Sequence, residues 1–220
     1  MRLQIRPPSL WLAYDLTRPD IVAKMLPGHL TLASIPLLRT DRCNGPKLLI
    51  NAYDVSSLWM NGHRVEIQTI AKDTRRNTLH FVILQCLSNV NQWDPLGGVQ
   101  PSNAACRSRH TGTTFDLSVT SKDSLGSFNV TGTYDRDDTP VSRRFVVDAN
   151  LECYYRTHPQ PFPLTFDEDE VLHPVRRLTS VTIQNTLWTR VRKLRPSHAF
   201  VHTRPMTYRV NVADLWYDWI

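Results

Sequence analysis

The sequence lacks most of the patterns by which an enzyme or a membrane protein is usually identified. It has no GxSxG nucleophile elbow, no P-loop and no GxGxxG fingerprint. Its apolar runs all fall short of about 18 residues, which argues against a membrane-spanning helix. Two arginines and two prolines precede the first apolar run, unlike the start of a secretory signal peptide. These absences favour a cytoplasmic protein without a membrane partner, and they leave the reaction unnamed.

Cysteine and glycine are also scarce. The four cysteines show neither CxxC spacing nor a His/Cys cluster, so we expect no zinc site. Cys86 and Cys153 lie in apolar runs and are interpreted as buried thiols of a reducing compartment. The 15 prolines outnumber the 8 glycines, which suits a protein of strands and stiff loops better than a helix bundle.

Lysine is the scarce basic residue, with five lysines against 21 arginines. The formal net charge of +6 invites a nucleic-acid partner. The basic residues are nevertheless spread along the chain, and the densest cluster is the short segment 190–195. An arginine-rich surface, or one or two arginines directed at an anionic small ligand, accounts for the charge better. We therefore expect a small-molecule substrate rather than nucleic acid, and a homo-oligomer stays open.

What the sequence does contain is a series of short strand-like segments. Residues 63–71 alternate between polar and apolar side chains, the pattern of a half-buried strand. The Asn61-Gly62 pair before them predicts a two-residue hairpin turn, and residues 17–27 predict a helix with Pro19 in its first turn. Further strands are predicted at 9–16, 30–38, 48–60, 78–87, 162–166, 176–188 and 198–212, with a hairpin over 114–135 and a second helix over 144–157. The length of 220 residues suits a single domain, 1–220, of α+β type that is predominantly β, with a curved sheet or barrel-like shape and two or three short helices.

The segment 63–71 carries the sharpest candidate for chemistry. Arg64, Glu66 and Gln68 project to one side of the predicted strand, because side chains alternate between its faces. If that side is enclosed, Glu66 can act as a general acid or base and Arg64 can hold an anionic group or a developing enolate, with Gln68 in contact with the substrate. If it faces water, the three residues form a polar surface with a weak ion pair.

Four other side chains are candidates of second rank. His80 is flanked by apolar residues and is either a structural, half-buried histidine or a partner in acid–base catalysis. Tyr14 and Tyr53 lie in predicted strands, where each can donate a hydrogen bond to a carbonyl ligand or pack in the core. Trp59, like Trp11, is interpreted as part of the core or of a pocket wall.

The segment "QWDPLGGVQPSNA", residues 92–104, combines features of a pocket wall. Trp93 offers an apolar surface, and Gly97-Gly98 lets the backbone approach a ligand. Ser102 and Asn103 offer neutral hydrogen bonds. The alternative interpretation is a rigid surface loop.

Metal binding is not expected. His198 and His202 are four residues apart in a predicted strand, which places them about 13 Å from each other and too far apart for one ion. The acidic run at 167–170 is interpreted as a solvated loop. We therefore expect neither a metal nor another cofactor.

Three segments resemble successive parts of one superfamily. They are "WLAYDLTRPDIVAKMLPGHL" at 11–30, "FVVDANLECYYR" at 145–156 and "PSHAFVHTRPMTYRVNV" at 196–212. Their order and spacing are similar to those of acetoacetate-decarboxylase-like proteins and of a related uncharacterised bacterial family. The resemblance implies a conical or barrel-like antiparallel sheet around a small-molecule cavity. It also places a strand glutamate of the decarboxylases near the position of Glu66.

The sequence departs from this family at the residue that forms the imine. In the decarboxylases a Trp-Gly-Phe-Pro-Lys-Lys segment supplies the reactive lysine, whereas Ser102 and Asn103 occupy the lysine-like positions here. An imine requires such an amine. The prediction is therefore a cofactor-free lyase, cyclase or isomerase that acts beside a carbonyl of a small keto-acid or polyketide-like metabolite. The alternative is a non-catalytic small-ligand-binding protein of the same fold.

Overall fold

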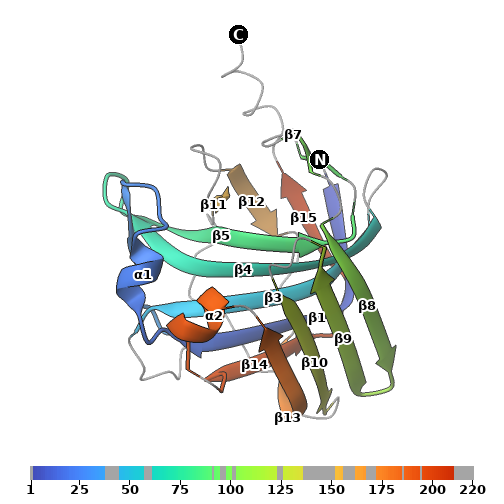
Figure 1. Ribbon diagram of the computed structural model, residues 1–220. Coiled ribbons are helices and arrows are strands. Elements are labelled where there is room, and N and C mark those ends of the chain that lie inside the picture. The colour runs from blue at the N-terminus through green and yellow to red at the C-terminus, as the bar shows by residue number, and fades with distance from the viewer. Residues whose placement is uncertain are drawn as a thin grey trace.

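Strands dominate the structure, a computed structural model that describes residues 2–37, 45–56, 61–90, 92–94, 98–100, 103–122, 126–135, 152–155, 162–166, 172–184, 186–193 and 195–210 (Figure 1). The strands are β1 (Arg2–Asp15), β2 (Leu30–Leu32), β3 (Lys47–Ser56), β4 (Asn61–Asp73), β5 (Thr78–Ser88), β6 (Gln92–Asp94), β7 (Gly98–Gln100), β8 (Ala104–Thr111), β9 (Thr114–Ser121), β10 (Ser127–Tyr134), β11 (Glu152–Tyr155), β12 (Phe162–Phe166), β13 (Leu172–Gln184), β14 (His198–His202) and β15 (Met206–Val210). The helices are α1 (Pro19–Ala23) and α2 (Thr186–Val191). Within the described residues no helix has the length and apolar character needed to span a membrane.

One curved sheet joins most of these strands in the order β15-β12-β11-β5-β4-β3-β1-β14-β13-β10-β9-β8, with β2 attached to β4. Its pairings are antiparallel except for β11 against β5. Strand β15 pairs with β12 and also with residues 2–5 of β1. The path through β3, β4, β5, β11, β12 and β15 therefore leads back to β1. The predicted fold class, predominantly β with a curved antiparallel sheet and short helices, is confirmed.

The start of β4 differs from the prediction. Asn61 and Gly62 are not a turn but the first two residues of β4, where Asn61 pairs with Ser56, and the connection lies in 57–60, outside the described residues. Gly62 has φ +147°, and a Cβ atom there would come within 2.4 Å of Asn89 Oδ1. That oxygen accepts a hydrogen bond from the His63 backbone N–H at 2.7 Å. The glycine therefore serves a close approach of two chain segments rather than a hairpin turn.

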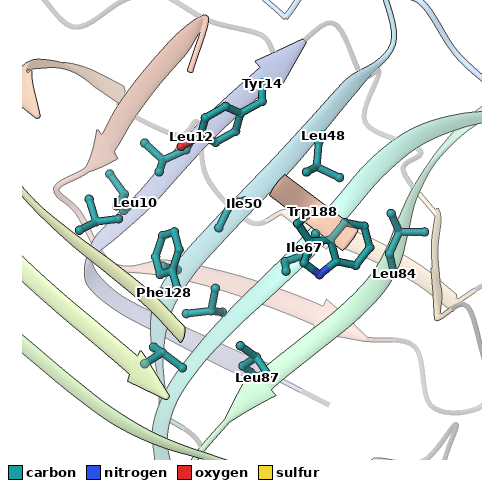
Figure 2. Close-up of a cluster of buried hydrophobic side chains, with 14 of the residues drawn as sticks. Leu10, Leu12, Tyr14, Leu48, Ile50, Ile67, Leu84, Leu87, Phe128 and Trp188 are labelled. Carbon is teal, nitrogen blue, oxygen red and sulfur yellow. The ribbon is translucent and has the colours of Figure 1, made fainter. Parts of the chain in front are cut away.

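A second layer, formed by β8, β9, β10 and β13, lies in front of the long strands in Figure 1. Strand β9 shows how the sequence creates it, because buried Phe115, Leu117 and Val119 alternate with more exposed residues. Figure 2 shows the apolar cluster between the layers, which includes Leu10, Leu12, Tyr14, Leu48, Ile50, Ile67, Leu84, Leu87, Phe128 and Trp188. Trp188 enters it from α2, and its indole N–H donates a hydrogen bond to Gln85 Oε1.

The long strands curl strongly away from this second layer. Trp11 on β1 and Phe81 on β5 are separated by two intervening strands, which would place them about 14 Å apart in a flat sheet. Their ring centroids are nevertheless 6.0 Å apart. The sheet must therefore bend toward the face that carries both rings, and that face is concave.

Two predicted elements have a different structure. Residues 152–155 of the predicted helix 144–157 form strand β11, because pairing with the edge of β5 outweighs the local helical pattern; the neighbouring residues 144–151 lie outside the described residues. The predicted strand 176–188 ends at Gln184 and is followed by α2, which directs Trp188 into the core. The predicted strand 198–212 is divided into β14 and β15.

Candidate functional site

Strand β4 buries a row of polar side chains on the concave face. Arg64 and Glu66 are 5% exposed and Gln68 is 4% exposed. The residues between them, Val65 and Ile67, belong to the apolar cluster on the other face. The alternation that the sequence predicts is therefore present, and both faces of β4 are shielded from water.

The three side chains converge on one carboxylate. Glu66 Oε1 accepts a hydrogen bond from Tyr53 Oη at 2.7 Å and lies 2.9 Å from Arg64 Nη2. Glu66 Oε2 accepts a hydrogen bond from Gln68 Nε2 at 2.5 Å. Tyr53 comes from β3, directly opposite Arg64 in the pairing of β3 with β4. We refer to Tyr53, Arg64, Glu66 and Gln68 as the Glu66 cluster.

Neighbouring strands extend this polar surface with residues that the sequence did not suggest. Asn51 on β3 and Cys86 on β5 lie on either side of Glu66 in the strand pairing. Asn51 is buried, and its Oδ1 accepts a hydrogen bond from Ser9 Oγ at 3.2 Å. The signal for Asn51 is a polar residue between the apolar Ile50 and Ala52. Its proximity to Glu66 depends on the strand register, which one sequence does not reveal.

The arrangement of the cluster suits proton transfer. A buried carboxylate with a guanidinium and a phenol on the same oxygen can exchange a proton while its neighbours stabilise a developing negative charge. All three partners of Glu66 donate hydrogen bonds to it, so a substrate has to draw at least one of them away. The arrangement is therefore chemically able to provide both an acid–base group and hydrogen-bond donors for an oxyanion.

His80 and Tyr14 do not lie with this cluster. His80 is fully buried on the face of β5 that joins the apolar cluster, opposite Ala71, and its Nε2 lies 2.8 Å from Thr78 Oγ1. Tyr14 belongs to the apolar cluster itself, and the Arg192 guanidinium lies 4.5 Å from the centre of its ring. Burial raises the pKa of Tyr14 to about 12. The sheet separates both residues from Glu66, so the role predicted for them beside it has no geometric support.

The structure describes only part of the segment 92–104. Within that part, Asn103 has a structural role. Asn103 Oδ1 accepts a hydrogen bond from the Ser88 backbone N–H at 2.8 Å, and its Nδ2 donates to the Cys86 carbonyl at 2.9 Å. The side-chain amide of Asn103 therefore binds the backbone at the end of β5 through both its oxygen and its nitrogen. Trp59, Ser102 and the side chain of Trp93 lie outside the described residues.

The remaining candidates have ordinary surroundings. His198 and His202 stand at opposite ends of β14, and within the described ranges no three His, Cys, Asp or Glu side chains gather as a metal site. The acidic run at 167–170 lies outside those ranges. Cys86 and Cys106 are half-buried, and burial raises the pKa of the Cys106 thiol to about 11. The side chain of Cys153 is not among those described.

A small hollow lies between β1, β3 and β9, and Tyr53 is the member of the Glu66 cluster that contributes to its lining. Leu10, Ala52, Phe115 and Leu117 contribute to its lining, and its volume is about 20 Å³. Such a volume holds about one water molecule and no organic ligand.

No protein-family model and no curated protein matches the sequence. Among solved structures, an acetoacetate decarboxylase-like enzyme from Sphingomonas wittichii RW1 is similar, with a TM-score of 0.60 at 8% identity over 95% of this chain and 89% of that chain. Acetoacetate decarboxylase from Legionella pneumophila subsp. pneumophila str. Philadelphia 1 is similar with a TM-score of 0.58 at 9% identity, over 96% and 87%. The chain therefore has the fold of acetoacetate decarboxylase-like proteins, as its sequence resemblance implied. At this identity the likeness concerns the fold alone.

Proposed function

We propose that this protein is an enzyme that moves a proton next to the carbonyl group of a small metabolite, as a lyase, cyclase or isomerase, with Glu66 as the acid–base group. The observation that carries the proposal is the buried Glu66 carboxylate, held by Tyr53, Arg64 and Gln68 on the concave face of the sheet. Buried ionisable groups with specific partners are common at catalytic sites. The similar fold of two proteins that are described as an acetoacetate decarboxylase and a decarboxylase-like enzyme adds support.

The proposed reaction uses the charge balance of the cluster. Glu66 takes the proton from the carbon beside the carbonyl and becomes neutral. The electrons of that C–H bond move to the carbonyl oxygen, which becomes an enolate. Arg64 then no longer faces a charged Glu66, so it becomes the counter-ion of the enolate, and Tyr53 turns its hydroxyl to the same oxygen. In an isomerase, Glu66 returns the proton to a different atom of the enolate. In a lyase, the enolate expels a leaving group with the electron pair of the broken bond, and that group takes the proton from Glu66.

The proposed chemistry does not use an imine. All five lysines fall within the described residues, and four of them are exposed. The buried one, Lys47, is ion-paired with Asp15, to which Lys193 also binds at 2.9 Å. An opposite charge favours the protonated amine, whereas imine formation needs the free amine. This pairing supports acid–base catalysis by Glu66 over a lysine nucleophile.

A non-catalytic ligand carrier is the alternative function. It is favoured by the saturation of Glu66, because both carboxylate oxygens already accept hydrogen bonds within the protein. In a carrier the same donors would hold a ligand without any transfer of its protons.

Exchange of substrate protons with solvent separates the two functions. A panel of methyl ketones is incubated with the protein in D₂O, and loss of the signal of the protons beside the carbonyl is followed by NMR. An enzyme accelerates the exchange for at least one ketone, and Glu66→Gln lowers that rate by about 10²–10⁴-fold while ketone binding stays within a few-fold.

The matched control is Asp116→Asn, which makes the same carboxylate-to-amide change at an exposed position on β9. It should leave the exchange rate unchanged. Binding of a ketone without any acceleration of its exchange would establish the carrier and exclude the enzyme.

A further inference from the structure

The Glu66 cluster is balanced in charge before any ligand arrives. It contains one guanidinium and one carboxylate, whose side chains are 6% and 7% exposed and lie 2.9 Å apart. A ligand carboxylate would bring a second negative charge beside Glu66, with the charge of Arg64 already shared. Like charges repel more strongly where water is excluded than in bulk solvent. A neutral ligand adds no such repulsion.

The cluster also contains a buried hydrogen-bond acceptor, Gln68 Oε1, to which a ligand could donate a hydrogen bond. A carboxylate only accepts hydrogen bonds from its neighbours, so the amide nitrogen of Gln68 has to face Glu66 and its oxygen has to face away. Gln68 Oε1 is buried, and none of the described residues donates a hydrogen bond to it. A buried acceptor without a donor is costly. A ligand that carries an O–H or N–H group would satisfy it.

Aromatic side chains flank the polar surface on the same face. Trp11 pairs with Asn51, which in turn pairs with Glu66, so all three lie in one row across the strands. Phe200 pairs with Trp11 from β14, and Phe81 contacts the Trp11 ring at 6.0 Å. Flat apolar walls of this kind favour a planar ligand over a compact one.

From the charge balance, the buried acceptor and the rings we infer that the site takes a neutral, planar compound with a carbonyl beside a hydroxyl group, and that it discriminates against carboxylates. Enolised 1,3-dicarbonyl compounds and ortho-hydroxyaryl ketones have this chemistry. The carbonyl oxygen accepts a hydrogen bond from Arg64 or Tyr53, and the hydroxyl donates to Gln68 Oε1. The inference rests on the proposed function for the location of the ligand. Of the predicted keto-acid or polyketide-like metabolites, it excludes the keto acids, which are anions at neutral pH, and keeps the uncharged polyketide-like compounds.

Two small molecules of nearly equal shape test the inference. 2′-Hydroxyacetophenone, which carries its hydroxyl on the ring next to the acetyl group, and salicylate are both planar and have a hydroxyl beside a carbonyl. The first is a neutral methyl ketone and the second is an anion at neutral pH. Their dissociation constants are measured by calorimetry with the full-length protein. We expect the ketone to bind at least about tenfold more tightly, because a like charge beside Glu66 opposes salicylate.

Glu66→Gln should invert this preference. The variant removes the negative charge of Glu66 and keeps the positive charge of Arg64, so salicylate binding should improve by about tenfold or more while ketone binding changes only a few-fold. Thermal unfolding checks that the variant is folded. Gln68→Leu gives a second measurement, because it removes the acceptor and leaves both charges in place. It should abolish the advantage of 2′-hydroxyacetophenone over acetophenone, which lacks the hydroxyl.

Each outcome decides the inference. Wild-type protein that binds salicylate as tightly as the ketone, or that binds neither probe below about 10 mM, would overturn it, and so would a Gln68→Leu variant that keeps the preference for the hydroxyl. The proposed function is judged separately by proton exchange. A protein that prefers the ketone but exchanges no protons would keep this ligand class and lose its catalytic role.

Discussion

The two faces of strands β3 and β4 are both largely buried, but their side chains differ in chemistry. Toward the second layer they present Ile50, Val65 and Ile67, which join the apolar cluster. Toward the concave side they present Glu66 and its polar neighbours, with similarly low exposure. Burial of the first face stabilises the fold through the hydrophobic effect, whereas burial of the second requires desolvation of two charges. Low exposure therefore does not by itself identify a core, and the cost of burying the second face is what the proposed role in binding and chemistry would account for.

The largest expected effect comes from breaking the buried ion pair. Arg64→Met removes the cation beside Glu66 and should lower the free energy of unfolding by about 3–5 kcal/mol. The double variant Arg64→Met/Glu66→Leu makes the concave face resemble the apolar one, and it should be about as stable as the wild type or more stable, yet inactive. Urea denaturation measures both. A double variant no more stable than the single one would contradict the view that the pair is retained for function.

A substitution that creates a cavity on the apolar face should lower stability but leave activity unchanged. Ile50→Ala removes buried methyl and methylene groups from the cluster and should cost about 3 kcal/mol of unfolding free energy, whereas Ile50→Val should cost about 1 kcal/mol. Activity per folded molecule should stay within about twofold, because Ile50 points away from Glu66. If folded Ile50→Ala loses activity at a temperature where Ile50→Val is fully active, the two faces are not independent.

Two tyrosines give a matched comparison of the faces. Tyr53→Phe removes a hydrogen bond to a buried carboxylate and should cost about 2 kcal/mol, together with part of the activity. Tyr14→Phe removes a hydroxyl that makes no hydrogen bond with any described residue, so stability should be unchanged or slightly improved. Because burial raises the pKa of Tyr14 to about 12, its absorbance near 295 nm should appear only at strongly alkaline pH and be missing in Tyr14→Phe. Equal losses of stability in the two variants would contradict the comparison.

The smallest effect is expected where the two faces end, at the turn between β4 and β5. Burial acts to raise the pKa of Asp73, but the backbone N–H of Arg75, its guanidinium and the backbone N–H of Arg76 outweigh it and lower that pKa from 3.8 to about 2. The folded state therefore binds a proton less readily than the unfolded state. The resulting stability is present above about pH 4 and is lost as the pH falls toward 2.

Asp73→Asn tests this linkage by thermal unfolding between pH 2 and 7. The variant should be less stable than the wild type at pH 7, and the difference should shrink as the pH falls toward 2. Arg75 is mostly exposed, so part of the effect should be screened by salt. A difference that stays constant over this pH range would show that the carboxylate charge is not its cause.

Much of the strand content could be predicted because alternation is a local property. Residues 63–71 and 78–87 were expected as strands and lie within β4 and β5. Residues 152–155 were expected as part of a helix and form β11, because they pair with a distant strand edge. The predicted turn at Asn61-Gly62 was wrong for a similar reason, since Gly62 lies against Asn89, the residue that follows β5.

The spacing of Arg64, Glu66 and Gln68 was enough to place them on one side of a strand, because successive side chains point to opposite faces in any strand. Which residues of other strands share that side depends on register, and register is a property of the assembled sheet. A shift between Ile67 and Gln68 in the pairing with β5 changes which of its residues face the cluster, so that Cys86 joins Glu66 while His80 lies opposite Ala71 in the core. The curl of the sheet then shields the polar side from water. This curl brings together strands that are not neighbours, as in the contact of Trp11 with Phe81, so it is decided by the tertiary structure.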